Sequence, residues 1–299
     1  MNILVFGSLN IDFLYSVDHI VKHGETISSV SFAKSAGGKG ANQAAALAKA
    51  GLPVYMAGKI GGDGKFLTEL LKSYGVNTNN VIQYDGATGH AIIQIDKNGQ
   101  NSIVLYSGGN GEITAEEIKQ TILKFKAGDI VVLQNEISNI NEIMKTAKKQ
   151  GIKICLNPSP FNENIFSLPL ETVEWFFVNE IEGSALAGMQ AVSEPEESNF
   201  FAIIKKLTKL FPGAQIILTA GKKGAFYGSG ETILSEGIID VPVIDTTAAG
   251  DTFTGYFLAA QSRNLSLQQV LKTACKAASI TVSRKGAMET IPSAAEVFN

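Results

Sequence analysis

Short apolar runs alternate with longer helical patterns along this 299-residue chain, and that alternation constrains the fold most strongly. The strand candidates are rich in β-branched and aromatic residues: Ile3–Phe6, Val54–Ala57, Ile130–Leu133, Lys153–Leu156, Trp175–Val178 and Ile216–Thr219. Stretches with helical periodicity lie between them: Ala41–Ala50, Lys65–Tyr74, Ala115–Phe125, Ile140–Gln150 and Phe201–Phe211. Because nearly continuous apolar strands are buried on both faces, the pattern predicts an α/β fold, a parallel sheet covered by helices on both sides.

Two regions interrupt this alternation. Phe13–Lys34 alternates in polarity without a helical pattern, and Gly89–Tyr106 contains two strand candidates, Ala91–Ile95 and Ser102–Tyr106. The Asn-Gly pair between those strands favours a tight hairpin turn. We expect the two regions to form a small inserted β-sheet that closes over a site as a lid. Two separate surface hairpins are the alternative.

Composition excludes several classes of function. The net charge of −3 provides no broad basic field for nucleic acid or an anionic membrane. The only cysteines, Cys155 and Cys275, have no CxxC partner, which argues against a disulfide framework or a Cys/His zinc site. Met1–Gly7 is typical of a first strand rather than a signal peptide, and no apolar run is long enough to span a membrane. We therefore expect a cytoplasmic enzyme.

The first of two glycine-rich segments is Gly37-Gly-Lys-Gly-Ala-Asn42, which precedes an alanine-rich helix. It matches neither the Walker phosphate loop nor the dinucleotide fingerprint, which is also absent after the first strand. Glycines allow close backbone approach, and Lys39 and Asn42 add hydrogen-bond donors. Such a loop suits a polyhydroxylated ligand, with an ordinary flexible turn as the alternative.

The second segment, Asp245–Gly255, leads small residues into a helix whose first backbone N–H groups have no intrahelical partner. Those groups and the helix dipole form an anion site. A carboxylate at Asp251 would repel phosphate, so its presence there favours a base that removes a hydroxyl proton. A simple helix cap is the alternative.

These segments and four others follow one another as they do in the ribokinase (PfkB) family of sugar kinases, which the chain resembles over nearly its whole length. The matching segments are Gly7–Asp12, Gly37–Asn42, Asn179–Glu182, Thr219–Gly224, Asp245–Gly255 and Arg284–Ala287. The resemblance implies one kinase domain over residues 1–299, with a ribokinase-like three-layer α/β/α sandwich. A small β-sheet lid from about residues 12–35 and 88–107 would cover the sugar, and a homodimer would form through this lid.

The resemblance also implies a mechanism. Asp251 takes the proton of the sugar's primary hydroxyl, which attacks the γ-phosphoryl group of ATP. Backbone N–H groups at the start of the helix stabilise the transferring group, namely those of Ala248, Ala249 and Gly250. Mg²⁺ bridges the phosphates, and Asn179 and Glu182 organise it through water, as fits a cation that keeps several waters.

Further site residues carry over from the same resemblance. The sugar-binding positions are Asn10, Asp12, Gly38, Lys39, Asn42, Glu136 and Asp251. Read alone, Asp12 would be a turn residue, Lys39 a solvated charge and Glu136 a helix cap. The ATP-binding positions are Asn179, Glu182, Thr219, Gly221, Gly224, Gly250 and Cys275. Cys275 departs from the polar or aromatic residue that the family often carries near adenine.

A monovalent cation, usually K⁺, activates ribokinases next to the anion site. The matching positions are Asp245, Thr247, Thr281, Arg284, Gly286 and Thr290, several of them through backbone carbonyls. Thr247 replaces a common aliphatic residue and Thr290 a common serine.

The expected reaction is conversion of D-ribose to D-ribose 5-phosphate. Deoxyribose, fructose or a nucleoside remain alternative substrates because few contacts read a single hydroxyl. A non-catalytic sugar-binding regulator on the same fold is the alternative from another class, since fold does not imply function. Retention of Asp251 and the anion-site residues argues against it.

Overall fold

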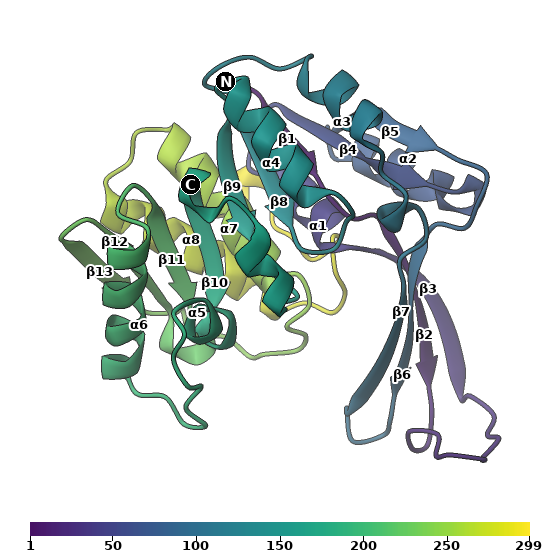
Figure 1. The fold of residues 1–299 in the computed structure, drawn as a ribbon. Coiled ribbons are helices and arrows are strands. Elements are labelled where there is room, and N and C mark those ends of the chain that lie inside the picture. Colours follow the sequence, from purple (N-terminus) through teal and green to yellow (C-terminus); the bar gives the residue numbers. More distant parts are fainter.

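Two β-sheets organise the chain in the computed structural model, which describes all residues 1–299 (Figure 1). The large sheet has the order β13-β12-β11-β10-β9-β8-β1-β4-β5. Its strands are β1 (Ile3–Phe6), β4 (Val54–Ile60), β5 (Asn77–Gln83), β8 (Ile130–Gln134), β9 (Lys153–Asn157), β10 (Val173–Asn179), β11 (Gln215–Thr219), β12 (Ala225–Ser229) and β13 (Thr232–Glu236). Pairing is parallel from β5 across to β11 and antiparallel at the β12–β13 edge, which confirms the predicted parallel core.

Helices cover both faces of this sheet. One layer contains α1 (Lys39–Lys49), α2 (Lys65–Ser73), α7 (Ala249–Ser262) and α8 (Leu267–Val282). The other contains α3 (Ala115–Ile122), α4 (Ile140–Lys149), α5 (Glu180–Leu186) and α6 (Glu197–Leu210), and α9 (Ala294–Phe298) ends the chain. Short 3₁₀ turns lie at Gly62–Gly64, Gly108–Gly111, Glu163–Ser167, Leu170–Thr172 and Gly221–Lys223.

Strand β1 shows why the strands lack alternating polarity. Ile3 and Val5 lie in the core under α1 and α7, while Leu4 and Phe6 lie in the core on the opposite face. Successive side chains point to opposite faces of a strand, so both faces must be apolar when helices cover both. The predicted α/β/α sandwich is thereby confirmed.

The second sheet has the order β3-β2-β6-β7 and projects from the body (Figure 1). Its strands are β2 (Asn10–Ser16), β3 (Ser31–Gly37), β6 (Gly89–Ile95) and β7 (Asn101–Tyr106). Because β2 pairs with β6 in parallel, the two interrupting regions form one sheet, and the alternative of two separate hairpins was wrong. We call this sheet the small sheet below.

Close backbone packing seats α1 against its neighbours. A Cβ atom on Gly40 would lie 2.5 Å from the Ser8 nitrogen, and one on Gly255 would lie 2.6 Å from the Ala46 Cβ. Only glycine fits at such distances, so the start of α1 sits directly on the end of β1 and its middle packs against α7. No helix combines the length and apolar character that crossing a membrane requires.

Candidate active site

The predicted motifs meet at the edge of the large sheet where the parallel strands end. The residues that end or follow β1, β8, β9, β10 and β11 at this edge include Ser8, Glu136, Asn157, Asn179 and Thr219. The first turns of α1 and α7 reach the same place, because Asn42 and Gln43 of α1 contact Asp251 of α7. Ligands of open α/β sheets bind outside the carboxyl ends of the strands, so this edge is the candidate site.

Asp251 lies in the first turn of α7 and does not cap it. The N-cap is Ala248, in a left-handed conformation with φ of 60°, and no side chain caps the helix. The cap alternative was therefore wrong. The Asp251 carboxylate instead accepts hydrogen bonds from Asn42 Nδ2 at 3.0 Å and from Gln43 Nε2 at 2.9 Å. Gln134 Nε2 donates in turn to Gln43 Oε1 at 2.6 Å, which orients the Gln43 amide toward Asp251.

Electrostatics make Asp251 a stronger base than an ordinary carboxylate. Burial raises its pKa, while the Lys39 ammonium and the Gln43 and Asn42 amides oppose that rise. Lys39 itself is half-buried and lies near three carboxylates rather than at an open surface. Burial alone would lower the pKa of Lys39, but the carboxylates of Asp251, Glu136 and Glu182 raise it above its usual range, so the side chain stays cationic.

Backbone N–H groups beside Asp251 form the candidate anion site. The N–H groups of Ala248 and Gly250 donate to no group of the chain, whereas Ala249 donates to the Thr246 carbonyl at 3.3 Å. Two of the three predicted donors are thus unengaged, and the third is held by a weak turn contact. The dipole of the 14-residue α7 adds positive potential at this point.

Two carboxylates, Asp12 and Glu136, were predicted to bind the sugar. Asp12 lies within β2 rather than in a turn, and its carboxylate accepts no hydrogen bond from the chain. Burial and the nearby charge of Glu136 raise the pKa of Asp12 to about 6. Glu136 Oε2 accepts from Ser8 Oγ and, at 3.0 Å, from the backbone N–H of Lys39, the first residue of α1, so its carboxylate caps that helix as its alternative reading expected. The turn reading of Asp12 was therefore wrong, and the two carboxylates offer acceptors for hydroxyl donors.

Amide side chains on the same side of the site offer a hydrogen-bond donor and a hydrogen-bond acceptor. Asn110 Nδ2 donates to Asn10 Oδ1 at 2.7 Å, and Asn110 Oδ1 accepts from the Leu9 N–H at 3.1 Å. The Asn10 Nδ2 group is therefore left as a donor. The Asn42 Oδ1 atom is buried without any partner, which suits a ligand hydroxyl there. Gly38 turns the chain between these residues with φ of 94°.

The predicted nucleotide residues gather at the ends of β10 and β11. Asn179 pairs with Thr219 in the sheet register, and Asn179 and Glu182 form the capping box of α5, with bonds of 2.8 and 3.0 Å. The second Glu182 carboxylate oxygen accepts no hydrogen bond from the chain. Gly221 and Gly224 hold the following turn with φ of 50° and 87°.

Cys275 lies in α8 and is 4% exposed. Its thiol is 4.0 Å from the Glu236 carbonyl oxygen, and burial together with Glu236 raises its pKa to about 12. Cys275 therefore remains a neutral thiol at the end of β13.

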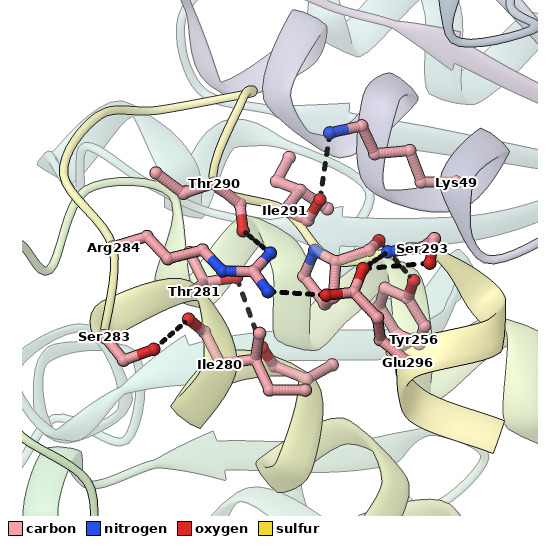
Figure 2. Close-up of polar contacts among 12 residues, drawn as sticks. Lys49, Tyr256, Ile280, Thr281, Ser283, Arg284, Thr290, Ile291, Ser293 and Glu296 are labelled. Atoms are coloured by element: carbon pink, nitrogen blue, oxygen red, sulfur yellow. Dashed lines mark hydrogen bonds and ion pairs between the residues drawn. The ribbon is translucent and has the colours of Figure 1, made fainter. Parts of the chain in front are cut away.

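The six predicted cation positions form one connected cluster. The Asp245 carboxylate accepts from the Thr247 N–H at 2.9 Å and from the Gly286 N–H at 3.1 Å. Burial opposes ionisation of Asp245, but these hydrogen bonds and the charge of Lys285 lower its pKa. The Arg284 N–H donates to the Thr281 carbonyl at 3.1 Å, and its guanidinium donates to the Thr290 carbonyl at 3.2 Å (Figure 2).

The donor set of this cluster suits K⁺. The carbonyl oxygens of Thr247, Arg284 and Gly286 accept no hydrogen bond from the chain, and the ionised Asp245 lies beside two of them. Backbone carbonyls that replace a hydration shell are typical K⁺ ligands. No group of three or more His, Cys, Asp or Glu side chains gathers as a metal site anywhere in the chain.

Sequence reasoning missed the side chains that orient the site: Ser8, Gln43, Asn110 and Gln134. Two carried a signal, because Gln43 directly follows the predicted Asn42 and Gln134 ends an otherwise apolar, buried strand. A fully buried polar side chain needs partners, which marks it for inspection. Ser8 and Asn110 gave no such pattern.

Known proteins resemble this chain over nearly its whole length. The pfkB family carbohydrate kinase pattern matches residues 1–294. A ribokinase of Haemophilus influenzae is 33% identical over 98% of this chain and 96% of its own. A ribokinase structure from Cryptococcus neoformans with ADP has a TM-score of 0.88 at 35% identity, covering 99% and 98% of the two chains. An Arabidopsis thaliana ribokinase with ribose and ATP has a TM-score of 0.84 at 33% identity, covering 99% and 97%. The chain, with its ribokinase-like fold, therefore belongs to the pfkB family of carbohydrate kinases.

Proposed function

We propose that this kinase phosphorylates the primary hydroxyl of D-ribose with ATP, giving D-ribose 5-phosphate and ADP, with Asp251 as the base. The observation that carries the proposal is the setting of Asp251: a buried carboxylate held by two amides, beside unengaged N–H groups at a helix start. A base next to an anion site fits transfer of a phosphoryl group to a hydroxyl. The 33% identity to a ribokinase with full coverage supports ribose.

The polarity of the pocket suggests how the sugar is held. Hydroxyl groups donate to Asp12, to Glu136 and to the unpartnered Asn42 Oδ1, and one hydroxyl oxygen accepts from Asn10 Nδ2. This orientation brings the primary hydroxyl to Asp251, which removes its proton as the oxygen forms its bond to the γ-phosphorus. The bond from that phosphorus to the β–γ bridging oxygen breaks, and ADP leaves. The N–H groups of Ala248 and Gly250 stabilise the charge on the transferring group.

We propose further that ATP lies along Asn179, Thr219, Gly221 and Gly224, with the adenine toward Cys275. The free Glu182 oxygen would hold Mg²⁺ through water, and Mg²⁺ supplies charge neutralisation on the phosphates when bound. The carbonyls and carboxylate of the Asp245 cluster would hold K⁺. The role of this chain's residues there is to fix the loop that leads into Asp251.

A homodimer through the small sheet is part of the proposal. Leu105 pairs with Ala91, which pairs with Asp12, so these residues share one face of the sheet. On that face Ile103 and Leu105 are 51% and 61% exposed. An exposed apolar face at the rim of a site is typical of a surface that another subunit covers.

A coupled ATP-consumption assay tests the activity. D-ribose, 2-deoxyribose, fructose and nucleosides are each offered with Mg²⁺, with K⁺ or Na⁺ as the monovalent cation. We expect the highest kcat/KM with D-ribose. Preference for another sugar or a nucleoside would change the assigned substrate but keep the assigned kinase activity. Turnover of none of these compounds, together with measurable ribose binding, would favour a sugar-binding regulator.

A further inference from the structure

Lys49 of α1, Tyr256 of α7 and Arg284, which follows α8, hold the segment 286–293 in the connection between α8 and α9. Lys49 Nζ donates to the carbonyls of Met288 at 2.8 Å and Ile291 at 2.9 Å. Arg284 donates to the Thr290 carbonyl at 3.2 Å, and Tyr256 Oη donates to the Pro292 carbonyl at 2.6 Å. Figure 2 shows Lys49 and Arg284 reaching these carbonyls from opposite sides. The segment is thus fixed through its backbone.

Lys49 is the unusual member of this set. It forms no ion pair with a carboxylate, and its ammonium lies against the two carbonyls and 4.3 Å from the centre of the Tyr74 ring. Burial lowers its pKa, with Arg284 adding to that effect and Glu289 and Glu296 opposing it. Removing a charge from water without an ion-pair partner is unfavourable unless hydrogen bonds replace the hydration. The two carbonyl contacts are therefore what keeps this side chain in place.

The position of Lys49 links two parts of the site. Lys49 is the last residue of α1, the helix that begins at Lys39 and contacts Asp251 through Asn42 and Gln43. The segment that it holds begins at Gly286, whose N–H binds the Asp245 carboxylate. Asp245 opens the loop that runs to Asp251. The contacts therefore close a ring from α1 through the segment 286–293 and the Asp245 loop back to α1.

We propose that Lys49 is a positioning residue for the monovalent-cation site. By fixing the segment 286–293 it sets where Gly286 meets Asp245, and hence where the unengaged carbonyls of Arg284 and Gly286 point. Cation binding is thereby coupled to the helix that carries the sugar-binding loop. This inference rests on the proposed K⁺ site.

The test compares Lys49→Met with a matched control, Lys276→Met. Lys276 also donates to two backbone carbonyls, those of Val297 at 2.8 Å and Asn299 at 3.4 Å, but at the end of the chain. The melting temperature of each protein is titrated with KCl at constant ionic strength, using NaCl as the balancing salt. Hydrogen exchange of residues 245–251 and 284–293 is measured on the same proteins, and ribose-dependent turnover is measured against K⁺.

For Lys49→Met we expect the K⁺ concentration at half-maximal stabilisation and half-maximal turnover to rise about tenfold, as for loss of a charge-assisted hydrogen bond. Exchange should become faster in both segments. Lys276→Met should keep the wild-type K⁺ midpoints and exchange in these segments. If K⁺ stabilises the wild type and Lys49→Met keeps its midpoint and its exchange, the positioning role is wrong while the cation site stands. If K⁺ and Na⁺ act alike on the wild-type protein, the cation site fails and the inference fails with it.

Discussion

The Asp251 end of the site and the small sheet are built in opposite ways. Around Asp251, the side chains of Asn42, Gln43 and Gln134 are buried, and each carboxylate oxygen of Asp251 receives one amide. On the small sheet, the Asp12 carboxylate has no hydrogen-bond partner, although its strand is paired on both sides. The two exposed apolar residues on its face, Ile103 and Leu105, also lack a cover.

In the proposed mechanism, this difference separates proton transfer at Asp251 from sugar binding at the small sheet. Groups that must be aligned in the transition state lie on helices packed into the core, where their geometry is set before the substrate arrives. On the small sheet, the Asp12 carboxylate and the exposed Ile103 and Leu105 would gain their partners from the proposed sugar and second subunit. Substitutions near Asp251 should therefore act on kcat, and those on the small sheet on KM and assembly.

A substitution of Gln43 tests the Asp251 end of the site. Gln43→Leu removes the amide from Asp251 Oδ1, and we expect kcat to fall about 10–100-fold, as for loss of a hydrogen bond to a charged group. The pKa of Asp251, already raised by burial, should rise further. Because only the ionised carboxylate accepts the proton, the acid limb of the kcat–pH profile should move to higher pH.

Gln261→Leu is the matched control. Gln261 lies on the same helix as Asp251 and donates to Gln215 Oε1 at 2.9 Å, away from the site. It should leave kcat and its pH profile unchanged. An equal loss of kcat in both variants, or an acid limb that does not move in Gln43→Leu, would show that Gln43 does not support Asp251 as the base.

A substitution of Asp12 tests the role of the small sheet in sugar binding. Asp12→Asn replaces a hydroxyl acceptor, so KM for the sugar should rise about tenfold or more with a smaller change in kcat. In the wild type, Asp12 is protonated as the pH falls through about 6, so KM should rise below that pH, and this rise should be absent in Asp12→Asn. Asp18→Asn, at an exposed ion pair with Lys97, should change neither parameter.

Stability supplies a second measurement on Asp12. A folded-state pKa raised from 3.8 to about 6 means that ionised Asp12 disfavours the folded state above pH 6, an effect that disappears below 3.8. Without sugar at pH 7, Asp12→Asn should therefore unfold at a higher temperature, by a free energy of about 1–3 kcal/mol. A lower melting temperature would show that Asp12 supports the fold rather than the ligand.

We expect the smallest effect on turnover from a substitution on the exposed apolar face of the small sheet, which carries Ile103 and Leu105. Leu105→Lys places a charge in the proposed dimer interface and should weaken dimerisation about 100-fold, as light scattering after size-exclusion chromatography would show. KM should rise less than in Asp12→Asn. Phe166→Lys, at a body residue that is 56% exposed, should leave the assembly unchanged. A wild-type monomer at all accessible concentrations would contradict the dimer.

The large sheet was predictable because its strands are apolar on both faces and separated by helical patterns. Strand β5 was missed because its first residues, Asn77-Thr-Asn-Asn80, lack that apolar character at the edge of the sheet. The β12–β13 hairpin was missed because Gly, Ser, Thr and Glu residues interrupt the apolar residues of its two strands, Ala225–Ser229 and Thr232–Glu236. Local pattern does not reveal strands whose stability comes from pairing with a neighbour.

The site residues were predictable as positions but not as contacts. Ordered motifs located Asp251 and Asp12, and single-residue readings as a cap and a turn both failed. The orientation of Asn10 depends on Asn110, which is 100 positions away, and that of Gln43 depends on Gln134, which is 91 away. Such contacts arise from tertiary packing, so no local sequence pattern predicts them.

Single-turnover phosphorylation of D-ribose by Asp251→Asn tests the account most directly, with ribose affinity measured by calorimetry on the same protein. Asparagine keeps the shape of the side chain and an oxygen for one of the two amides, but it cannot take a proton. We expect the transfer rate to fall by a factor of about 10²–10⁴. The dissociation constant for ribose should stay near that of the wild type. A transfer rate near the wild-type value would contradict the assignment of Asp251 as the base.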